Sequence, residues 1–271
     1  MSDFAGKSVI VTGSSSGIGE CTALMFARRG ANVTVCGRDE SRVHHVLQAC
    51  ITASKHAGYA KECIGVTGDM TIAAHREDVL EKTVAAFGKL DVLVANHGIM
   101  PAFPDLDSVT EETYDKIMSI NTKSVLFIIK AAAKHLEASQ GCVVVNSSIG
   151  STSTVKEALP YLMSKAALDH MVRSVALTLA PKGIRVNAIN PTLVITKLFR
   201  DQAENIESTE FGQFIAKSHP LHGRASEPEE QAEVVLFLAS SAARFITGEC
   251  VRVDGGISLK GMPSNYFNSN L

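Results

Sequence analysis

Short apolar runs alternate with longer helical patterns along nearly the whole chain, and this alternation constrains the fold more than any other feature. The predicted strands are Ser8–Thr12, Asn32–Cys36, Cys63–Thr67, Leu90–Ala95, Gly141–Asn146, Ile184–Asn190 and Cys250–Val253. Most contain consecutive apolar residues, which is typical of strands covered on both faces. The helices predicted between them are Ile18–Arg29, Glu40–Lys55, Ala73–Phe87, Glu111–Ala138, Glu157–Ala180 and Pro228–Ser240. The pattern predicts an α/β protein with a parallel sheet and right-handed crossovers.

No linker divides the chain. Its 271 residues suffice for one large α/β domain or two small ones, and no Gly/Ser-rich, Pro-rich or highly charged stretch separates two parts. We therefore expect a single domain over residues 1–271. Residues 192–223 form a long excursion between the sixth strand and the last helix. We expect a substrate lid there because the excursion follows the C-terminal end of a strand; a surface helical hairpin is the alternative.

Composition excludes several classes of partner. The net charge of −2 provides no electrostatic footprint for nucleic acid or an anionic membrane. The most apolar helix is interrupted by lysines, so no membrane span is predicted. The six cysteines are scattered without CxxC or zinc-type spacing, which indicates buried thiols in a reducing compartment and no metal site. A cytoplasmic location is expected; the final Ser269-Asn270-Leu271 only distantly resembles a peroxisomal address.

A glycine-rich turn follows the first predicted strand. Glycines spaced Gly-x-x-x-Gly-x-Gly permit a tight turn and a close approach of backbone N–H groups to a pyrophosphate, and the helix that follows directs its positive end at the anion. A generic strand-to-helix turn is the alternative, but its place at the first junction favours dinucleotide binding. The expected contacts are Gly13, Ser15, Ser16, Gly17, Ile18 and Gly19.

The ends of the second and third strands bear on the choice of cofactor. An NAD site usually places an acidic residue after the second strand, where this chain has Gly37 followed by Arg38. A guanidinium suits a 2′-phosphate, so NADP is preferred and NAD remains possible; a solvated Arg38 paired with Asp39 is the alternative. Asp69 and Met70 follow the third strand and are expected cofactor contacts, with Asp69 receiving the adenine amino group or capping the next helix.

Tyr161 and Lys165 lie four residues apart in the predicted helix Glu157–Ala180. Residues at this spacing share one helix face, so the phenol and the ammonium can enter the same pocket. A nearby positive charge favours the phenolate and lowers the pKa of a tyrosine, which could make it a general acid/base. Taken alone, such a pair more often lies on a surface.

Together these features resemble the short-chain dehydrogenase/reductase family, in its branch of single-domain enzymes of carbonyl-reductase and 3-oxoacyl-reductase type. The resemblance runs from Gly6 to about Gly256. It rests on Thr12–Gly19, Asp69, Ala95-Asn96-His97-Gly98, Asn121, Ser148, Tyr161 with Lys165, Asn190-Pro191, Ile246-Thr247-Gly248 and Val253-Asp254-Gly255-Gly256. It implies a Rossmann-type, doubly wound sheet of seven parallel strands with helices on both faces, a nicotinamide cofactor and a homotetramer.

The resemblance also assigns roles to residues. Tyr161 would donate a proton to a carbonyl oxygen, or accept one from an alcohol, while Ser148 holds that oxygen. Lys165 would lower the tyrosine pKa and bind the nicotinamide ribose, and Asn121 would anchor a water linked to the lysine. Neighbouring Ser147 is an alternative for Ser148. The further cofactor contacts implied are Asn96, Gly98, Tyr161, Lys165, Pro191, Val194 and Thr196.

Three positions depart from the family pattern. Ala95 replaces an asparagine, His97 an alanine and Thr192 a glycine, so the geometry of the lid and the shape of the substrate stay open. We expect an oxidoreductase that transfers a hydride between NADP(H) and a small-molecule ketone or aldehyde, or a secondary alcohol; the apolar residues around the site favour a hydrophobic or mixed compound. The alternatives are a non-catalytic nucleotide-binding sensor or scaffold on the same fold, and an epimerase or dehydratase of the longer sugar-nucleotide branch.

Overall fold

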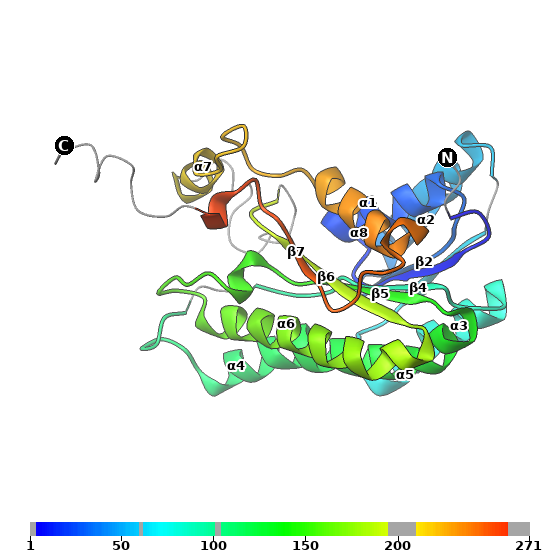
Figure 1. Cartoon of the computed structure of the whole chain (residues 1–271), viewed down its shortest axis with the longest axis horizontal. Helices are drawn as coiled ribbons and strands as arrows, with labels where there is room; N and C mark the ends of the chain where they lie inside the picture. The colour runs from blue at the N-terminus through cyan, green and yellow to red at the C-terminus, as the bar shows by residue number, and fades with distance from the viewer. Residues whose placement is uncertain (1–3, 60–61, 101–103, 195–209, 260–271) are drawn as a thin grey trace.

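The computed structural model describes residues 4–59, 62–100, 104–194 and 210–259 (Figure 1). Seven strands form one parallel sheet in the order β3-β2-β1-β4-β5-β6-β7. They are β1 (Ser8–Val11), β2 (Asn32–Gly37), β3 (Cys63–Thr67), β4 (Val92–Ala95), β5 (Cys142–Asn146), β6 (Arg185–Pro191) and β7 (Cys250–Val253). All seven predicted strands are present, with ends within two residues of those expected.

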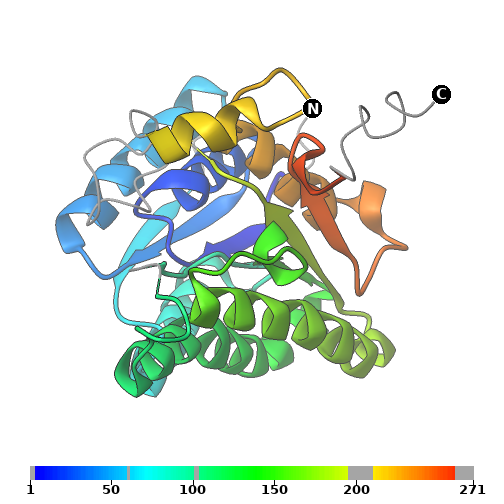
Figure 2. The ribbon, with the colours of Figure 1, turned by 90° about the vertical axis from the view of Figure 1, so that its left-hand side faces the viewer.

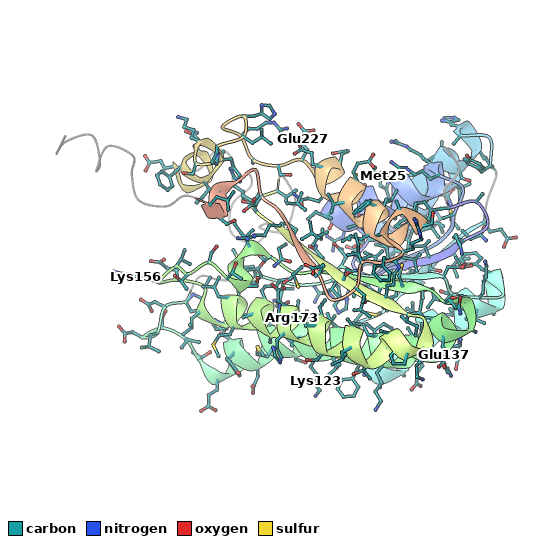
Figure 3. All side chains as sticks on the ribbon, viewed as in Figure 1. Met25, Lys123, Glu137, Lys156, Arg173 and Glu227 are labelled. Atoms are coloured by element: carbon teal, nitrogen blue, oxygen red, sulfur yellow. The ribbon has the colours of Figure 1, made fainter. Side chains whose placement is uncertain are left out.

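Helices cover both faces of the sheet. One face carries α1 (Gly17–Arg28), α2 (Glu40–His56) and α8 (Pro228–Ala239). The other carries α3 (Ala73–Phe87), α4 (Glu111–Met118), α5 (Ser124–Ser139) and α6 (Leu159–Leu179). Charged side chains such as Lys123, Glu137 and Lys156 lie on the outside (Figure 3). In the described part of the chain, no helix combines the length and apolar character needed to cross a bilayer.

The sheet separates two hydrophobic clusters. In β1, Val9 and Val11 pack on the side of α1, where they meet Phe26. Ile10 points to the opposite side and packs with residues of α5 and α6, such as Ile128 and Leu168. All four residues of β1 are buried, which is the pattern of a central strand in a doubly wound sheet. The prediction of an α/β fold with two covered faces is confirmed.

β1 lies between β2 and β4, so the sheet winds in opposite directions from this strand. At such a switch point the connections leaving the carboxyl ends of the two neighbouring strands diverge and open a crevice. Figure 2 shows the loops of these strand ends gathered on one side of the sheet, with α7 (Glu210–Lys217) near them. The glycine-rich turn after β1 is at this edge.

One local prediction is corrected. The single helix expected over Glu111–Ala138 is interrupted by a π-helical turn at Ser119–Lys123, between α4 and α5. Asn121, in that turn, bonds to the loop after β4 rather than to its own helix. At the start of α8, Glu227 forms a capping box with Glu230, and the preceding Ser226 is held in a β-bridge with Val194.

Candidate active site

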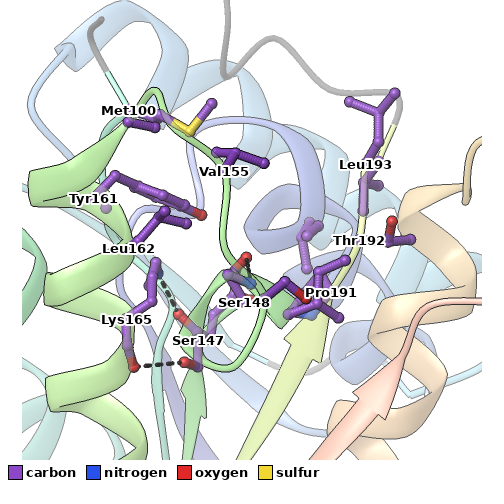
Figure 4. Close-up of a pocket in the computed structure, with 18 of the residues that line it drawn as sticks. Met100, Ser147, Ser148, Val155, Tyr161, Leu162, Lys165, Pro191, Thr192 and Leu193 are labelled. Atoms are coloured by element: carbon purple, nitrogen blue, oxygen red, sulfur yellow. Dashed lines mark hydrogen bonds between the residues drawn. The ribbon is translucent and has the colours of Figure 1, made fainter. Parts of the chain in front are cut away.

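A pocket of about 270 Å³ lies at the carboxyl ends of the strands (Figure 4). Several predicted site residues contribute to its wall: Ile18, Asn96, Gly98, Ser148, Tyr161, Lys165, Pro191 and Val194. The rest of its lining is mostly apolar, with Ile99, Met100, Val155, Leu162, Leu193, Ile215 and Ile257. Residues that are far apart in the sequence, on α1, β5, α6 and β6, therefore meet around one cavity.

The glycine turn is shaped by close backbone contacts. Gly13 has φ +64°, and a Cβ at this position would lie 2.8 Å from the Cα of His97. A Cβ at Gly19 would lie 2.5 Å from the Gly13 carbonyl oxygen. Asn96 Nδ2 donates to the Thr12 and Gly13 carbonyl oxygens at 3.1 Å each. No larger residue fits at Gly13 or Gly19 without displacing the backbone.

The beginning of α1 suits an anion. Ser16 is its N-cap, in extended conformation, and its side chain makes no capping hydrogen bond. The first N–H groups of a helix lack partners within the helix and carry its positive dipole end. A phosphate of a dinucleotide fits this arrangement, with Ser15, Ser16, Gly17, Ile18 and Gly19 as the residues that would hold it.

The end of β2 leaves no space for an acidic side chain. A Cβ at Gly37 would lie 2.7 Å from Ser15 Oγ and 3.1 Å from Val43 Cγ2. Arg38 is exposed, and among the described residues it has no hydrogen-bond or ion-pair partner. Asp39, the partner considered from sequence, instead caps α2 through the Arg42 backbone N–H at 3.1 Å and pairs with the Arg42 guanidinium at 2.8 Å. The guanidinium of Arg38 is thus not neutralised by its neighbour.

Asp69 and Met70 follow β3. Asp69 Oδ1 receives hydrogen bonds from the backbone N–H and the hydroxyl of Thr71, at 2.8 and 2.7 Å. Burial works to raise the pKa of Asp69, but these bonds and the charge of Arg38 lower it overall. The carboxylate therefore closes a turn before α3 (Ala73–Phe87) and does not cap that helix, whose N-cap is Ile72. Contact with an adenine amino group stays a prediction. The side chain of Met70 is buried in the hydrophobic core.

Tyr161 and Lys165 both project from α6 into the pocket (Figure 4). Lys165 Nζ lies 5.6 Å from the centre of the Tyr161 ring and donates to the Asn146 carbonyl oxygen at 2.9 Å. Lys165 is only 4% exposed, and burial lowers its pKa to about 8. Its ammonium is therefore still the main form at neutral pH.

Ser148 and Ser147 face different groups. Ser148 Oγ accepts a hydrogen bond from the Gly150 backbone N–H at 3.0 Å, and its side chain lies near enough to the Tyr161 phenol to lower the pKa of that group. Ser147 is buried, and its Oγ donates to Asp169 Oδ1 at 2.6 Å. Of the two serines considered from sequence, Ser148 is the one placed beside the phenol.

The pKa of Tyr161 runs opposite to the direction expected from a neighbouring lysine. Burial, which disfavours the phenolate, raises this pKa, while the hydrogen bond with Ser148 lowers it to a smaller extent. Desolvation therefore sets the direction in which this pKa moves. The neutral phenol, which can donate a proton, is the form present near neutral pH.

Asn121 is completely buried, and protein partners satisfy its side chain. Its Oδ1 accepts from the Ile99 backbone N–H at 2.8 Å, and its Nδ2 donates to the Ile99 carbonyl oxygen at 2.9 Å and to Ser164 Oγ at 3.1 Å. These bonds fix the loop after β4 against α6. The side chain is thus a support for the loop that contains Gly98 and Ile99.

His97 has a defined structural role. Its Nε2 lies 2.6 Å from Ser124 Oγ and its Nδ1 lies 2.7 Å from Thr12 Oγ1. Because the Ser124 hydroxyl donates to the Ile120 carbonyl oxygen, Nε2 must carry the proton and Nδ1 accepts from Thr12. Burial, followed by the charge of Lys165, lowers the pKa of His97 to about 4, which agrees with this neutral tautomer.

Thr192, which also departs from the family pattern, is hydrogen-bonded to the segment that follows α7. Its hydroxyl lies 2.8 Å from Nε2 of His219, whose Nδ1 lies 3.0 Å from the Ala216 carbonyl oxygen at the end of α7. His219 is 3% exposed and was not recognised from the sequence. Thr196 and the middle of the expected lid, residues 195–209, lie outside the described residues.

Comparisons with known proteins agree with this geometry. A family model described as "Enoyl-(Acyl carrier protein) reductase" matches residues 13–258. The chain is 33% identical over 270 residues to a glucose 1-dehydrogenase from Gluconobacter oxydans, covering 98% of this chain and 97% of that protein. It is 35% identical to an L-rhamnose 1-dehydrogenase (NAD(P)(+)) from Azotobacter vinelandii, covering 93% and 96%. A solved short-chain dehydrogenase/reductase of unknown function from Caenorhabditis elegans, with cofactor, has a TM-score of 0.86 and 35% identity over 96% and 98% of the chains.

Proposed function

The chain belongs to the short-chain dehydrogenase/reductase family, and from this premise we propose that it transfers a hydride between NADP(H) and a ketone or aldehyde, or the matching secondary alcohol. Tyr161 is the general acid/base in this proposal. The observation that supports it best is the meeting of Tyr161, Lys165 and Ser148 in one pocket beside the glycine turn. A proton donor, a buried cation and a hydroxyl are then available at the same substrate oxygen.

The nicotinamide supplies or accepts the hydride when the cofactor is bound. The substrate oxygen receives hydrogen bonds from the hydroxyls of Ser148 and Tyr161. In reduction, the Tyr161 hydroxyl transfers its proton to that oxygen as the alcohol forms, and the adjacent Lys165 ammonium stabilises the phenolate left behind. In oxidation, the same proton moves from the alcohol to the phenolate.

The protonation state of Tyr161 favours reduction near neutral pH. Burial raises the pKa of its phenol, so the proton donor is present without any prior ionisation. Oxidation needs the phenolate and should therefore become faster as the pH rises. The neutral Tyr161 and a preference for NADP together support reduction as the direction of the reaction.

Two features support NADP over NAD. Gly37 has no space for the carboxylate that would receive a ribose 2′-OH, and the exposed Arg38 is free to pair with a 2′-phosphate. Arg38→Ala should weaken NADPH binding about ten- to a hundred-fold, the effect of one hydrogen bond to a charged group, and leave NADH binding unchanged. Fluorescence titrations with both cofactors measure this, with Arg42→Ala as a control because Arg42 is held by Asp39. Equal NADPH and NADH affinity in the unmodified protein would contradict the preference.

The pocket wall suggests a compact, uncharged substrate. Lys165 is its only charged side chain among the described residues, and the polar side chains besides Ser148 and Tyr161 are Asn96, Asn146, Ser147, Ser153 and Thr192. The relatives named for glucose and rhamnose act on polyhydroxylated compounds, which require many hydrogen-bond partners. We propose a ketone or aldehyde of mainly apolar character. A panel of cyclic ketones, aliphatic aldehydes and aldoses, assayed by NADPH consumption, tests this; preference for the aldoses would overturn it.

We further propose a lid, an oligomeric state and a cellular location for this protein. Thr192, Leu193, Val194 and Ile215 line the pocket, which supports a lid over residues 192–223 of a single domain. We also propose that the protein forms a homotetramer and is located in the cytoplasm. Light scattering of the purified protein measures the tetramer directly, and a monomeric mass would exclude it.

A further inference from the structure

A second buried ionisable group lies beneath the catalytic pair. Asp169 follows Lys165 by four residues on α6, so the two side chains share a helix face one turn apart. Asp169 is 5% exposed and Lys165 is 4% exposed. A carboxylate removed from water is unstable unless it is paired and hydrogen-bonded. The buried carboxylate of Asp169 therefore requires hydrogen-bond donors or a positive charge close to it.

The hydrogen-bond partners of Asp169 are neutral. Oδ1 receives a hydrogen bond from Ser147 Oγ at 2.6 Å, and Oδ2 receives one from Asn190 Nδ2 at 2.7 Å. Both donors are neutral, so neither cancels the charge of the carboxylate. In the part of the chain that the structure describes, no ion pair within 4.0 Å includes Asp169. The negative charge of the carboxylate is therefore not neutralised by a direct ion pair and can stabilise a positive charge nearby.

Few titratable groups surround the pair. Tyr161 lies on the pocket side of Lys165, and His97, in the loop after β4, is near enough for Lys165 to lower its pKa. From β7, Cys250 Sγ lies 3.9 Å from the Asp169 carbonyl oxygen. Arg173 is one further turn along α6 and is exposed (Figure 3). The buried cation facing Asp169 is therefore Lys165.

Asp169 is also connected to the catalytic serine. The Asn190 amide that bonds Oδ2 lies 3.0 Å from the Ser148 carbonyl oxygen and 2.8 Å from Ser151 Oγ. Ser147, bonded to Oδ1, is the residue before Ser148. The carboxylate therefore joins α6 to the ends of β5 and β6, where the two serines and Pro191 form the pocket floor.

We propose that Asp169 is a positioning residue of this site, whose carboxylate keeps the buried Lys165 in its ammonium form and holds Ser147 and Asn190 beneath Ser148. This inference rests on the proposed function for its consequence in catalysis, but not for the state of Lys165. Burial lowers the pKa of Lys165, and Asp169 is the charge that raises it. Without that carboxylate, the desolvated lysine loses its proton at a lower pH.

The test is the titration of Lys165 in the cofactor-free protein. Competitive labelling with acetic anhydride across a pH series, read by mass spectrometry of the Lys165 peptide, gives the midpoint for this one lysine. Asp169→Asn should lower the midpoint by about one pH unit or more, the effect of removing one nearby opposite charge. Ser147→Ala removes a hydrogen bond but keeps the carboxylate, so its midpoint should stay at the unmodified value.

Asp91→Asn is the matched control. Asp91 is a buried carboxylate just before β4, bonded to the Ser8 backbone N–H and to Lys7, and it lies at the opposite end of the strands. It should leave the Lys165 midpoint unchanged even if stability falls. An unchanged midpoint in Asp169→Asn, or an equal shift in Asp91→Asn, would overturn the inference.

Two further measurements distinguish a failure of the proposed function from a failure of the inference about Asp169. If the unmodified protein turns over no carbonyl or alcohol, the proposed function fails, while the labelling experiment still decides the role of Asp169. If turnover is found, the alkaline limb of its pH profile should move to lower pH in Asp169→Asn. If Asp169→Asn does not fold, carbon-13 NMR of labelled aspartate in the unmodified protein gives the answer, and an Asp169 carboxyl protonated at neutral pH would contradict the proposal.

Discussion

The two sides of the pocket are built by different means. On the cofactor side, the site consists of backbone: Gly13 and Gly19 are required because the chain approaches itself closely. On the catalytic side, side chains from separate elements are fixed by hydrogen bonds over long sequence distances, as in Ser147–Asp169 and Asn121–Ile99. The first arrangement depends on the absence of side chains and the second on their exact complement of donors and acceptors. Substitutions should therefore fail in different ways on the two sides.

Gly19→Ala should have the largest effect on the cofactor side. Its Cβ would lie 2.5 Å from the Gly13 carbonyl oxygen, which belongs to the backbone and cannot rotate away. We expect a loss of about 1–3 kcal/mol in the free energy of unfolding, as for other overpacked sites. Because the phosphate-binding turn must move, NADPH affinity should fall on the order of a hundred-fold. Denaturant unfolding and NADPH titration measure the two effects.

Gly58→Ala separates this close approach from the general preference of glycine for positive φ. Gly58 has φ +82°, and a Cβ at this position would have no atom within 4 Å, so only backbone strain of about 1 kcal/mol is expected. NADPH affinity should be unchanged. A similar loss of NADPH affinity in Gly19→Ala and Gly58→Ala would show that the close backbone approach at Gly19 is not what cofactor binding requires.

His97→Gln tests the side-chain network. The loss of one of its two buried hydrogen bonds should destabilise the protein at neutral pH by about 1–3 kcal/mol. The pKa of His97 is lowered from 6.5 to about 4, so between these values the unfolded state binds a proton that the folded state does not. This contribution to stability is present above pH 6.5 and is lost as the pH falls towards 4.

The difference in stability between the unmodified protein and His97→Gln should therefore narrow over that pH range. Urea unfolding at several pH values measures it, with the exposed His45→Gln as the control. A difference that stays constant with pH would mean that His97 is not held neutral.

Thr192→Val should have the smallest effect. It keeps the volume of the side chain but removes the hydrogen bond with His219, so a loss of about 1 kcal/mol is expected. Thr178→Val, on the exposed face of α6, is the control and should be nearly neutral. If Thr192→Val is also neutral, the pair does not stabilise the wall that leads to α7.

The parts of the molecule that the sequence predicts well are those with local signals. Consecutive apolar runs identified all seven strands, and glycine spacing identified the turn at the switch point. Tyr161 and Lys165 were found because four residues make one helical turn. Each of these patterns is contained within a few neighbouring residues, which is why it can be read without a structure.

The parts that were missed depend on contacts between distant residues. The π-helical turn at Ser119–Lys123 interrupts a helix of good periodicity, because Asn121 bonds to Ile99 in another segment. Asp169 looks like one polar residue in an amphipathic helix, and only the packing of α6 against β5 and β6 shows it to be buried. The direction of the Tyr161 pKa was also missed, because desolvation depends on the surrounding fold.

The most direct measurement is a comparison of unmodified protein with Tyr161→Phe, in NADPH-dependent turnover of the best substrate of the carbonyl panel and in NADPH titration. Removal of the general acid should reduce kcat by about a hundred- to ten-thousand-fold. NADPH affinity should be unchanged, because the ring and Lys165 remain. Tyr114→Phe, on the exposed surface of α4, is the control. Substantial turnover in Tyr161→Phe would contradict the assignment of Tyr161 as the proton donor.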